Sequence, residues 1–170
     1  MKHIFLLLTF LFCNLVSFSQ NITTFNGIPI DGSYETVKEQ LYQKGFVPKH
    51  INNREYFFGN YLYHNVNVYI DTISGKVFKL WVTDHDSYNA ETIKENFNFL
   101  VDYFTYHPNY QCCGCDKINE DSVIDVNNKI YGAYFIQDNN SNNRVWFQIK
   151  SFDKYYFMMM SFENWKNFKR

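Results

Sequence analysis

The stretch QCCGCDK, residues 111–117, holds three cysteines within four positions. Cys112 and Cys115 have the C-x-x-C spacing, and thiols so placed serve as metal ligands, as a disulfide or as a redox pair. A structural zinc site needs four N or S ligands, and a thioredoxin-like motif opens a helix after a strand, so neither pattern is complete here. We predict a Cys112–Cys115 disulfide, a Cys113 that is free or paired between chains, and no bound metal. Gly114 should supply the backbone freedom that so small a ring needs.

The triplet Asp84-His85-Asp86 also contains groups that hold metals or transfer protons. Consecutive residues at a strand end point in different directions, so the triplet is predicted to be a solvated link between a strand and a helix. The chain has no glycine-rich phosphate loop, no G-x-S-x-G and no H-E-x-x-H. We therefore expect no enzyme activity and no cofactor. A small secreted enzyme with an unrecognised site stays as an alternative.

A set of aromatic, amide and lysine side chains is predicted to point outward from the strands of a sheet. The residues of this predicted binding surface are Asn67, Tyr69, Lys79, Trp81, Trp146 and Gln148. Planar rings beside amides and a lysine are typical of a surface that binds a protein or a glycan. In the alternative arrangement, the segments 47–54 and 108–128 cover this face and bury the rings. A thiol redox or metal-binding protein built on Cys112–Cys115 is the other function that the sequence leaves open.

The first nineteen residues have the features of a signal peptide. Lys2 and His3 precede an apolar run from 4 to 12, which is too short to span a bilayer. Ser17-Phe18-Ser19 provides small residues at a cleavage site, so the mature chain should begin at Gln20. Cys13 follows Phe12 where a lipid-attachment cysteine would follow a small residue. We predict a periplasmic or secreted protein whose residues 20–170 form one domain.

The composition restricts the partners of the mature chain. Without Lys2, the 16 basic residues become 15 against 17 acidic ones, a formal net charge of −2. This balance disfavours nucleic acid, which calls for a basic patch. No later stretch is apolar enough for a membrane span. Aromatic residues make up 21% of the chain, which either a codon bias toward A and T or an aromatic binding surface would explain.

Two similar segments indicate an internal repeat. SYETVKEQL begins at Ser33 and NAETIKENF begins at Asn89, and both place an N-cap residue before a helix with glutamate in its first turn. Three strands are expected after each helix, giving α-β-β-β units over residues 25–84 and 87–163. We predict an α+β fold with one antiparallel sheet of about six strands and both helices on one of its faces.

Alternation along the predicted strands separates the inward from the outward side chains. The residues expected to face the helices are Val66, Val68, Ile70, Phe78, Leu80, Val82, Val145, Phe147 and Ile149. The last strand, 155–162, is apolar on both faces and should be central or covered.

The segment FNGIPIDGSYETVKEQLYQKGF, residues 25–46, resembles the opening of small secreted proteins from Bacteroidetes. GNYLYHNVNVYID, RVWFQIKS and SFENWKN are similar to later segments of that group. The layout is similar in outline to β-lactamase-inhibitor-protein-like and outer-membrane-assembly-lipoprotein-like folds. The resemblance implies export, supplies no catalytic residues and does not include the QCCGCDK segment. Two loop tripeptides resemble bacterial O-glycosylation sites, so Thr72 and Ser122 are candidate acceptors.

Overall fold

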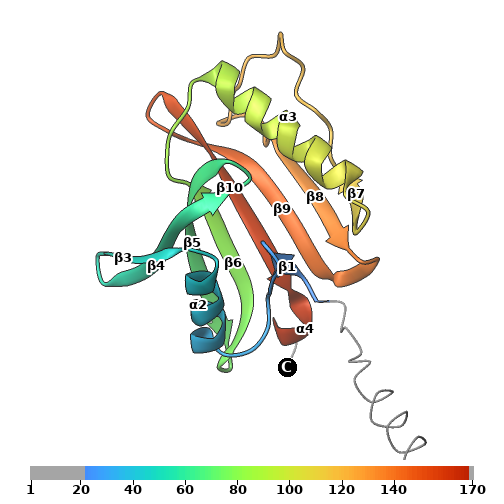
Figure 1. Ribbon diagram of the computed structural model, residues 1–170. Coiled ribbons are helices and arrows are strands. Elements are labelled where there is room, and N and C mark those ends of the chain that lie inside the picture. The colour runs from blue at the N-terminus through green and yellow to red at the C-terminus, as the bar shows by residue number, and fades with distance from the viewer. Residues whose placement is uncertain (1–21, 169–170) are drawn as a thin grey trace, which may run out of the picture.

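The computed structural model describes residues 22–168. The predicted signal peptide and its cleavage site at Ser19-Gln20 lie outside the described residues. Residues 22–168 form an α+β fold with three helices, a two-stranded sheet and an antiparallel sheet of eight strands (Figure 1). None of the helices in this part of the chain has the length and apolar character needed to cross a bilayer.

Eight strands, and not about six, make up the large sheet. Its spatial order is β3 (Val47–Ile51), β4 (Arg54–Tyr61), β5 (His64–Ile73), β6 (Lys76–Asp84), β10 (Tyr155–Asn164), β9 (Asn140–Phe152), β8 (Gly132–Gln137) and β7 (Tyr110–Gly114). The small sheet pairs β1 (Thr24–Phe25) with β2 (Ile28–Pro29), and the helices are α2 (Tyr34–Gln43), α3 (Ala90–Tyr106) and α4 (Trp165–Phe168). The two strands absent from the prediction, β3 and β7, are the edge strands, so four strands and not three follow each of the two longer helices.

The helix ends follow the predicted capping residues. The Ser33 side chain accepts a hydrogen bond of 3.2 Å from the backbone N–H of Thr36. The Asn89 side chain accepts one of 2.8 Å from Thr92. After α2, Gly45 has a φ of +85°, the left-handed conformation that ends a helix at low steric cost. The capping signals therefore fix where both helices begin and where α2 stops.

Both longer helices lie on the same face of the sheet, as predicted. One row of buried side chains crosses six consecutive strands, namely Phe57, Val68, Val82, Met160, Phe147 and Ala133. Tyr42 of α2 packs on Phe57 with 5.8 Å between ring centroids, and Phe97 of α3 packs on Phe147 with 5.4 Å. Figure 1 shows α2 and α3 in front of the strands. The last strand, β10, is central, as its two apolar faces predicted.

The prediction that Phe78 faces the helices is wrong because β6 contains a bulge. Asp71 pairs with Lys79 and Thr72 pairs with Val77, which leaves Phe78 as the extra residue. Val77 is fully buried in its place, while Phe78 is half-buried. The other predicted inward residues are buried, except that Ile70 is half-buried.

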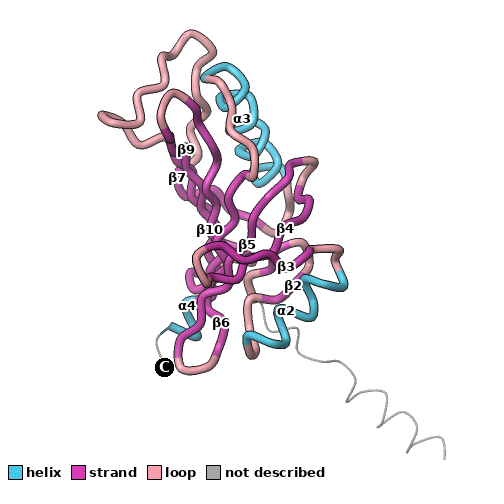
Figure 2. The backbone as a smooth tube through the Cα atoms, turned by 90° about the vertical axis from the view of Figure 1, so that its left-hand side faces the viewer, coloured by secondary structure: helices cyan, strands magenta, loops and turns pink. Residues whose placement is uncertain are grey.

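Segment 108–128 does not cover the face opposite the helices, contrary to the alternative arrangement considered above. The Asn98 side chain of α3 holds the backbone of Ile118 through two hydrogen bonds of 2.8 Å. Lys94 of the same helix donates to the carbonyl groups of Glu120 and Ser122. The loop therefore lies beside α3, as Figure 2 shows. Residues 47–54, the other segment considered, extend the sheet at its edge through β3.

Candidate functional site

The strand register gathers outward-facing side chains on the face of the sheet opposite α2 and α3, which we call the outer face. Tyr69 pairs with Trp81, Trp81 with Ser161, and Ser161 with Trp146. The serine is small, so the two indole rings meet above it, edge to face, with 5.3 Å between centroids. All six predicted binding residues are half-buried.

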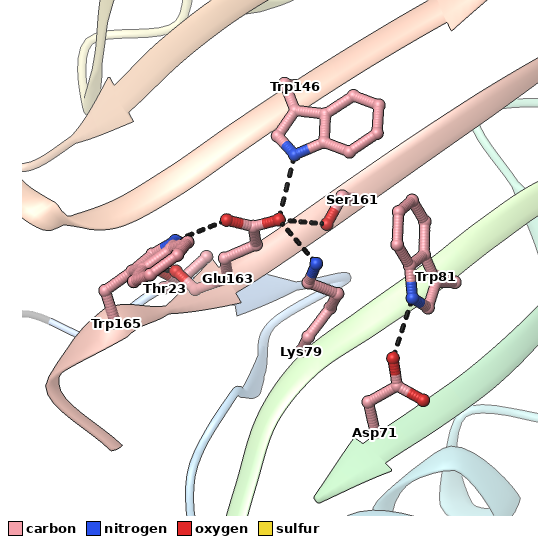
Figure 3. Close-up of polar contacts among 8 residues, drawn as sticks. All are labelled: Thr23, Asp71, Lys79, Trp81, Trp146, Ser161, Glu163 and Trp165. Atoms are coloured by element: carbon pink, nitrogen blue, oxygen red, sulfur yellow. Dashed lines mark hydrogen bonds and ion pairs between the residues drawn. The ribbon is translucent and has the colours of Figure 1, made fainter. Parts of the chain in front are cut away.

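A buried carboxylate, that of Glu163, fixes the position of the outer face residues around it (Figure 3). Its side chain accepts hydrogen bonds from Trp146 Nε1 at 2.8 Å, from Ser161 Oγ at 2.8 Å and from Trp165 Nε1. Lys79 Nζ lies 3.0 Å from the same carboxylate. Burial acts to raise the pKa of Glu163, but these donors outweigh it and hold the pKa below its usual value. The carboxylate is therefore a charged anchor beneath the aromatic rings.

Trp81 is anchored in the same manner by a second carboxylate. Its indole nitrogen donates to Asp71 Oδ2 at 2.7 Å, and Lys79 Nζ lies 4.3 Å from the ring centroid (Figure 3). Both tryptophans thus have their only polar group satisfied within the protein. What the rings offer to a ligand is apolar area in a fixed orientation.

Tyr69 extends the aromatic surface toward the edge of the sheet. It stacks on Tyr56 with 5.6 Å between centroids, and the Arg54 guanidinium lies 5.2 Å from its ring. Burial, followed by the nearby Tyr56, raises the pKa of the Tyr69 hydroxyl, which stays neutral. A shallow hollow of about 230 Å³ lies here, lined by Arg54, Tyr69, Trp81, Thr83 and Met159.

Asn67 and Gln148 lie on the outer face but one row away from the tryptophan pair. Asn67 pairs with Thr83 and Gln148 with Met159, so two strands separate the two amides. The Asn67 side chain lies 3.2 Å from His85 Nδ1. The structure thus brings Trp81, Trp146 and Lys79 into direct contact and leaves the amides at the side.

Sequence reasoning did not identify the groups that hold this surface together, which are Asp71, Glu163, Trp165 and Arg54. One signal was present, because Glu163 is the single charged residue in the apolar run from 155 to 163. A charge in such a strand is rarely buried without a partner. The identity of the partner, Lys79 on β6, depended on the sheet order.

The cysteines form the predicted disulfide. Cys112 and Cys115 are bonded with 5.9 Å between Cα atoms, and Cys113 is free and exposed. The first four residues of the segment 111–117 belong to the edge strand β7. In this strand Cys112 pairs with Phe135 and Gly114 with Tyr134, so Cys113 is a bulge residue. Gly114 has strand conformation and no positive φ, so the expectation about its backbone freedom is wrong. Within residues 22–168, no group of three or more His, Cys, Asp or Glu side chains is placed to hold a metal ion.

Asp84 departs from the prediction of a solvated link, since it is buried whereas His85 and Asp86 are exposed. Its carboxylate accepts a hydrogen bond of 2.8 Å from the backbone N–H of Met158. Burial raises the pKa of Asp84 to about 7, and the charge of Asp86 adds to this effect. The triplet does not converge on one point, so it makes no acid–base site.

The candidate glycan acceptors differ in accessibility. Thr72 is exposed but lies within β5 and not in the predicted loop, whereas Ser122 is half-buried in the loop beside α3.

Comparison with protein-family models, with curated proteins and with solved structures found no match to this chain. The outer face is therefore interpreted from its own geometry.

Proposed function

We propose that this protein is an exported, non-enzymatic binding module that holds a protein partner on its outer face. The observation that carries the proposal is the edge-to-face pair of Trp81 and Trp146, two half-buried rings that meet at 5.3 Å on this face. Residues that dominate the energy of protein interfaces are most often Trp, Tyr and Arg. Tyr69 and Arg54 continue the pair toward the sheet edge.

The rigidity of the ring positions favours tight binding. Trp81 and Trp146 donate to Asp71 and Glu163 at 2.7 and 2.8 Å. Rings already held in place lose little side-chain freedom when a partner binds, so less of the interaction free energy is spent on ordering them.

The charges of the outer face indicate the chemistry of the partner. Lys79 is neutralised by Glu163 at 3.0 Å. Arg54 has a side chain that is 65% exposed, at 3.6 Å from Asp71, and Arg144 lies 4.6 Å from the ring centroid of Trp165. A protein surface with apolar or aromatic side chains and carboxylates at its rim matches this arrangement.

Export to the periplasm or the medium is part of the proposal and depends on the predicted signal peptide and on the resemblance to secreted proteins of Bacteroidetes. N-terminal sequencing of the protein from its native host should begin at or near Gln20. Recovery of a chain that retains Met1 would contradict export.

We also propose that the sheet arose from two copies of one unit. Support comes from the element order, in which a capped helix precedes four strands twice, and from the strand order, in which β3 to β6 run inward from one edge and β7 to β10 run inward from the other.

The test of the proposed binding face begins with capture of envelope proteins on the immobilised mature chain. The captured protein is then purified, and its Kd is measured for the wild type and three variants. Arg54→Glu keeps the folded core intact and should weaken binding. The double variant Trp81→Ala, Trp146→Ala should abolish it. Tyr106→Ala, which removes an exposed α3 ring, is the matched control and should leave Kd unchanged.

A loss of affinity counts for the proposal only if thermal unfolding and circular dichroism show that the variants are folded. Equal Kd values for Arg54→Glu, the double variant and Tyr106→Ala would contradict it.

The alternative, a thiol redox protein, depends on the exposed Cys113 next to the Cys112–Cys115 disulfide. Its test is whether the mature protein speeds reduction of insulin by dithiothreitol, with Cys113→Ser as the comparison. The binding module is expected to show no such activity.

A further inference from the structure

A second hollow, of about 560 Å³, lies apart from the outer face, where the β1–β2 hairpin, the β4–β5 turn and the end of α3 come together. It is on the helix side of the sheet, because Phe25 of β1 packs against the buried Tyr61 and Phe162. Sites for small molecules usually have volumes of roughly 300–1,000 Å³. The hollow is therefore large enough for a ligand.

Aromatic rings make up much of its wall. The tyrosines that line it are Tyr61, Tyr63, Tyr103 and Tyr110. His107 joins them and packs on Tyr110 with 5.1 Å between centroids. Burial raises the pKa of Tyr61 far above its ordinary value and that of Tyr110 to about 12, and the nearby Tyr103 adds to both effects. The hydroxyls of Tyr61 and Tyr110, two of the tyrosines that line the hollow, are therefore neutral.

Side-chain amides provide the rest of the polar lining. The amide residues are Asn26, Asn60, Asn109 and Gln137. Gln137 is buried and accepts a hydrogen bond of 3.0 Å from the backbone N–H of Thr24, which fixes β1 to β8. No Asp, Glu, Lys or Arg side chain is among the described residues that line the hollow. A neutral ligand suits this lining, because the lining side chains offer it no carboxylate, ammonium or guanidinium group.

The turn at the edge of the hollow has an unusual sequence for its conformation. Leu62 and Tyr63 both have positive φ, at 48° and 71°. Equivalent turns with both residues at positive φ use Asn26–Gly27, Asn52–Asn53, Ser74–Gly75 and Asp138–Asn139, which tolerate that conformation. A tyrosine there is strained, and Tyr63 as a residue is 93% exposed. Strain retained at an exposed ring beside a hollow points to a binding role for that ring.

We propose that this hollow binds a neutral carbohydrate. The electron-rich faces of tyrosine rings pack against the polarised C–H groups of a pyranose, which carry partial positive charge. The amides and tyrosyl hydroxyls both donate and accept hydrogen bonds, as sugar hydroxyls require. Tyr63 stacks on a sugar unit at the mouth, while Asn60 and Asn109 contact its hydroxyls.

Calorimetric titration of the mature protein with cellohexaose, xylohexaose, mannohexaose and maltohexaose tests the proposal. At least one of these neutral oligosaccharides should bind. Tyr63→Gly, which keeps the turn geometry, should weaken that binding by about two- to tenfold, as the loss of one stacked ring predicts. Asn109→Ala, at an exposed position, should weaken it as well.

Two control variants separate this site from the outer face. Tyr106→Ala removes an exposed tyrosine that does not line the hollow and should bind as the wild type does. The double variant Trp81→Ala, Trp146→Ala should also retain oligosaccharide binding, whether or not it still binds the protein partner. The proposal is overturned if none of the four oligosaccharides binds, or if Tyr63→Gly binds them with the affinity of the wild type. It is also overturned if the double variant Trp81→Ala, Trp146→Ala loses oligosaccharide binding while Tyr63→Gly and Asn109→Ala retain it.

Discussion

Lys79 Nζ and Glu163 Oε1 lie 3.0 Å apart, directly across the β6–β10 pair and beneath the rings of Trp81 and Trp146. The side chains of the pair are only 16% and 4% exposed. Because the carboxylate also accepts from Trp146, Ser161 and Trp165, the ion pair and the aromatic surface form one structure. A change in either partner should alter both stability and the outer face.

Glu163→Gln should destabilise the protein by about 3 kcal/mol, since it leaves the Lys79 ammonium buried without its counter-charge. The matched control is Asp102→Asn, which breaks the more exposed ion pair between Asp102 and Lys117. That change should cost less than about 1 kcal/mol. Urea denaturation measures both. Equal losses of unfolding free energy in the two variants would show that the buried ion pair contributes no more to stability than the exposed one.

Asp84→Asn should stabilise the protein by clearly more at pH 8 than at pH 5. The folded-state pKa of Asp84 is about 7, above its value near ~4 in an unfolded chain. Between these values the folded state binds a proton that the unfolded state has lost, so stability falls as pH rises and the deficit is complete above pH ~7. The gain in the variant is at most about 4 kcal/mol.

The measurement is the difference in unfolding free energy between Asp84→Asn and the wild type at the two pH values. Burial lowers the pKa of the nearby His64, which costs stability as pH falls and so acts in the opposite direction. The difference between the two proteins cancels that contribution. The same difference at both pH values would mean that Asp84 does not titrate between them.

Sequence patterns located the interior elements of this fold but not its edges. In β9, the buried residues Val145, Phe147 and Ile149 alternate with outward-facing ones. This period of two arises because one face of the strand is buried, and it can be recognised in the sequence. The edge strand β3 shows no such alternation, because four of its five residues are exposed. The Asn52–Asn53 turn, typical of a hairpin, was the available signal for it.

The contacts within the site depend on pairing between strands that are distant in the sequence, so sequence patterns could not predict them. The outward direction of Trp81 and Trp146 follows from alternation within each strand. Their contact requires that β10 lie between β6 and β9, a fact of sheet order that no local pattern contains. The bulge at Phe78 is similar, because it depends on the register between β5 and β6.

Gly59→Ala should destabilise the protein by about 1–3 kcal/mol through overpacking. A Cβ at this position would lie 2.4 Å from a ring carbon of Phe46, a core residue that is only 2% exposed. Gly114→Ala is the control, because no atom lies within 4 Å of its added Cβ. Its effect should stay within about 0.5 kcal/mol. Thermal unfolding measures the stability of both variants. Unchanged stability in Gly59→Ala would show that the Phe46 ring can move to make room for the added methyl group.

Cys113 should be the residue that reacts with iodoacetamide in the folded mature protein without reductant, because Cys112 and Cys115 are bonded to each other. Peptide mapping by mass spectrometry identifies the modified residue. Replacing both bonded cysteines by serine should cost about 2 kcal/mol or less, since the loop that they close is short. Modification of all three cysteines before reduction would contradict the disulfide.

Tyr63→Gly should stabilise the protein by about 1 kcal/mol, even though it removes a side chain proposed to bind sugar. The φ of 71° at Tyr63 is strained for a tyrosine and is freely available to glycine. Tyr63 is 93% exposed, so the loss of its side chain removes little packing. Asn53→Gly is the matched control, because Asn53 holds the same place in the β3–β4 turn with a φ of 62° that asparagine tolerates. Urea denaturation should show a larger gain for Tyr63→Gly than for Asn53→Gly. Loss of stability in Tyr63→Gly would mean that the tyrosine is retained for folding, whereas a gain accompanied by weaker oligosaccharide binding would mean that it is retained for function.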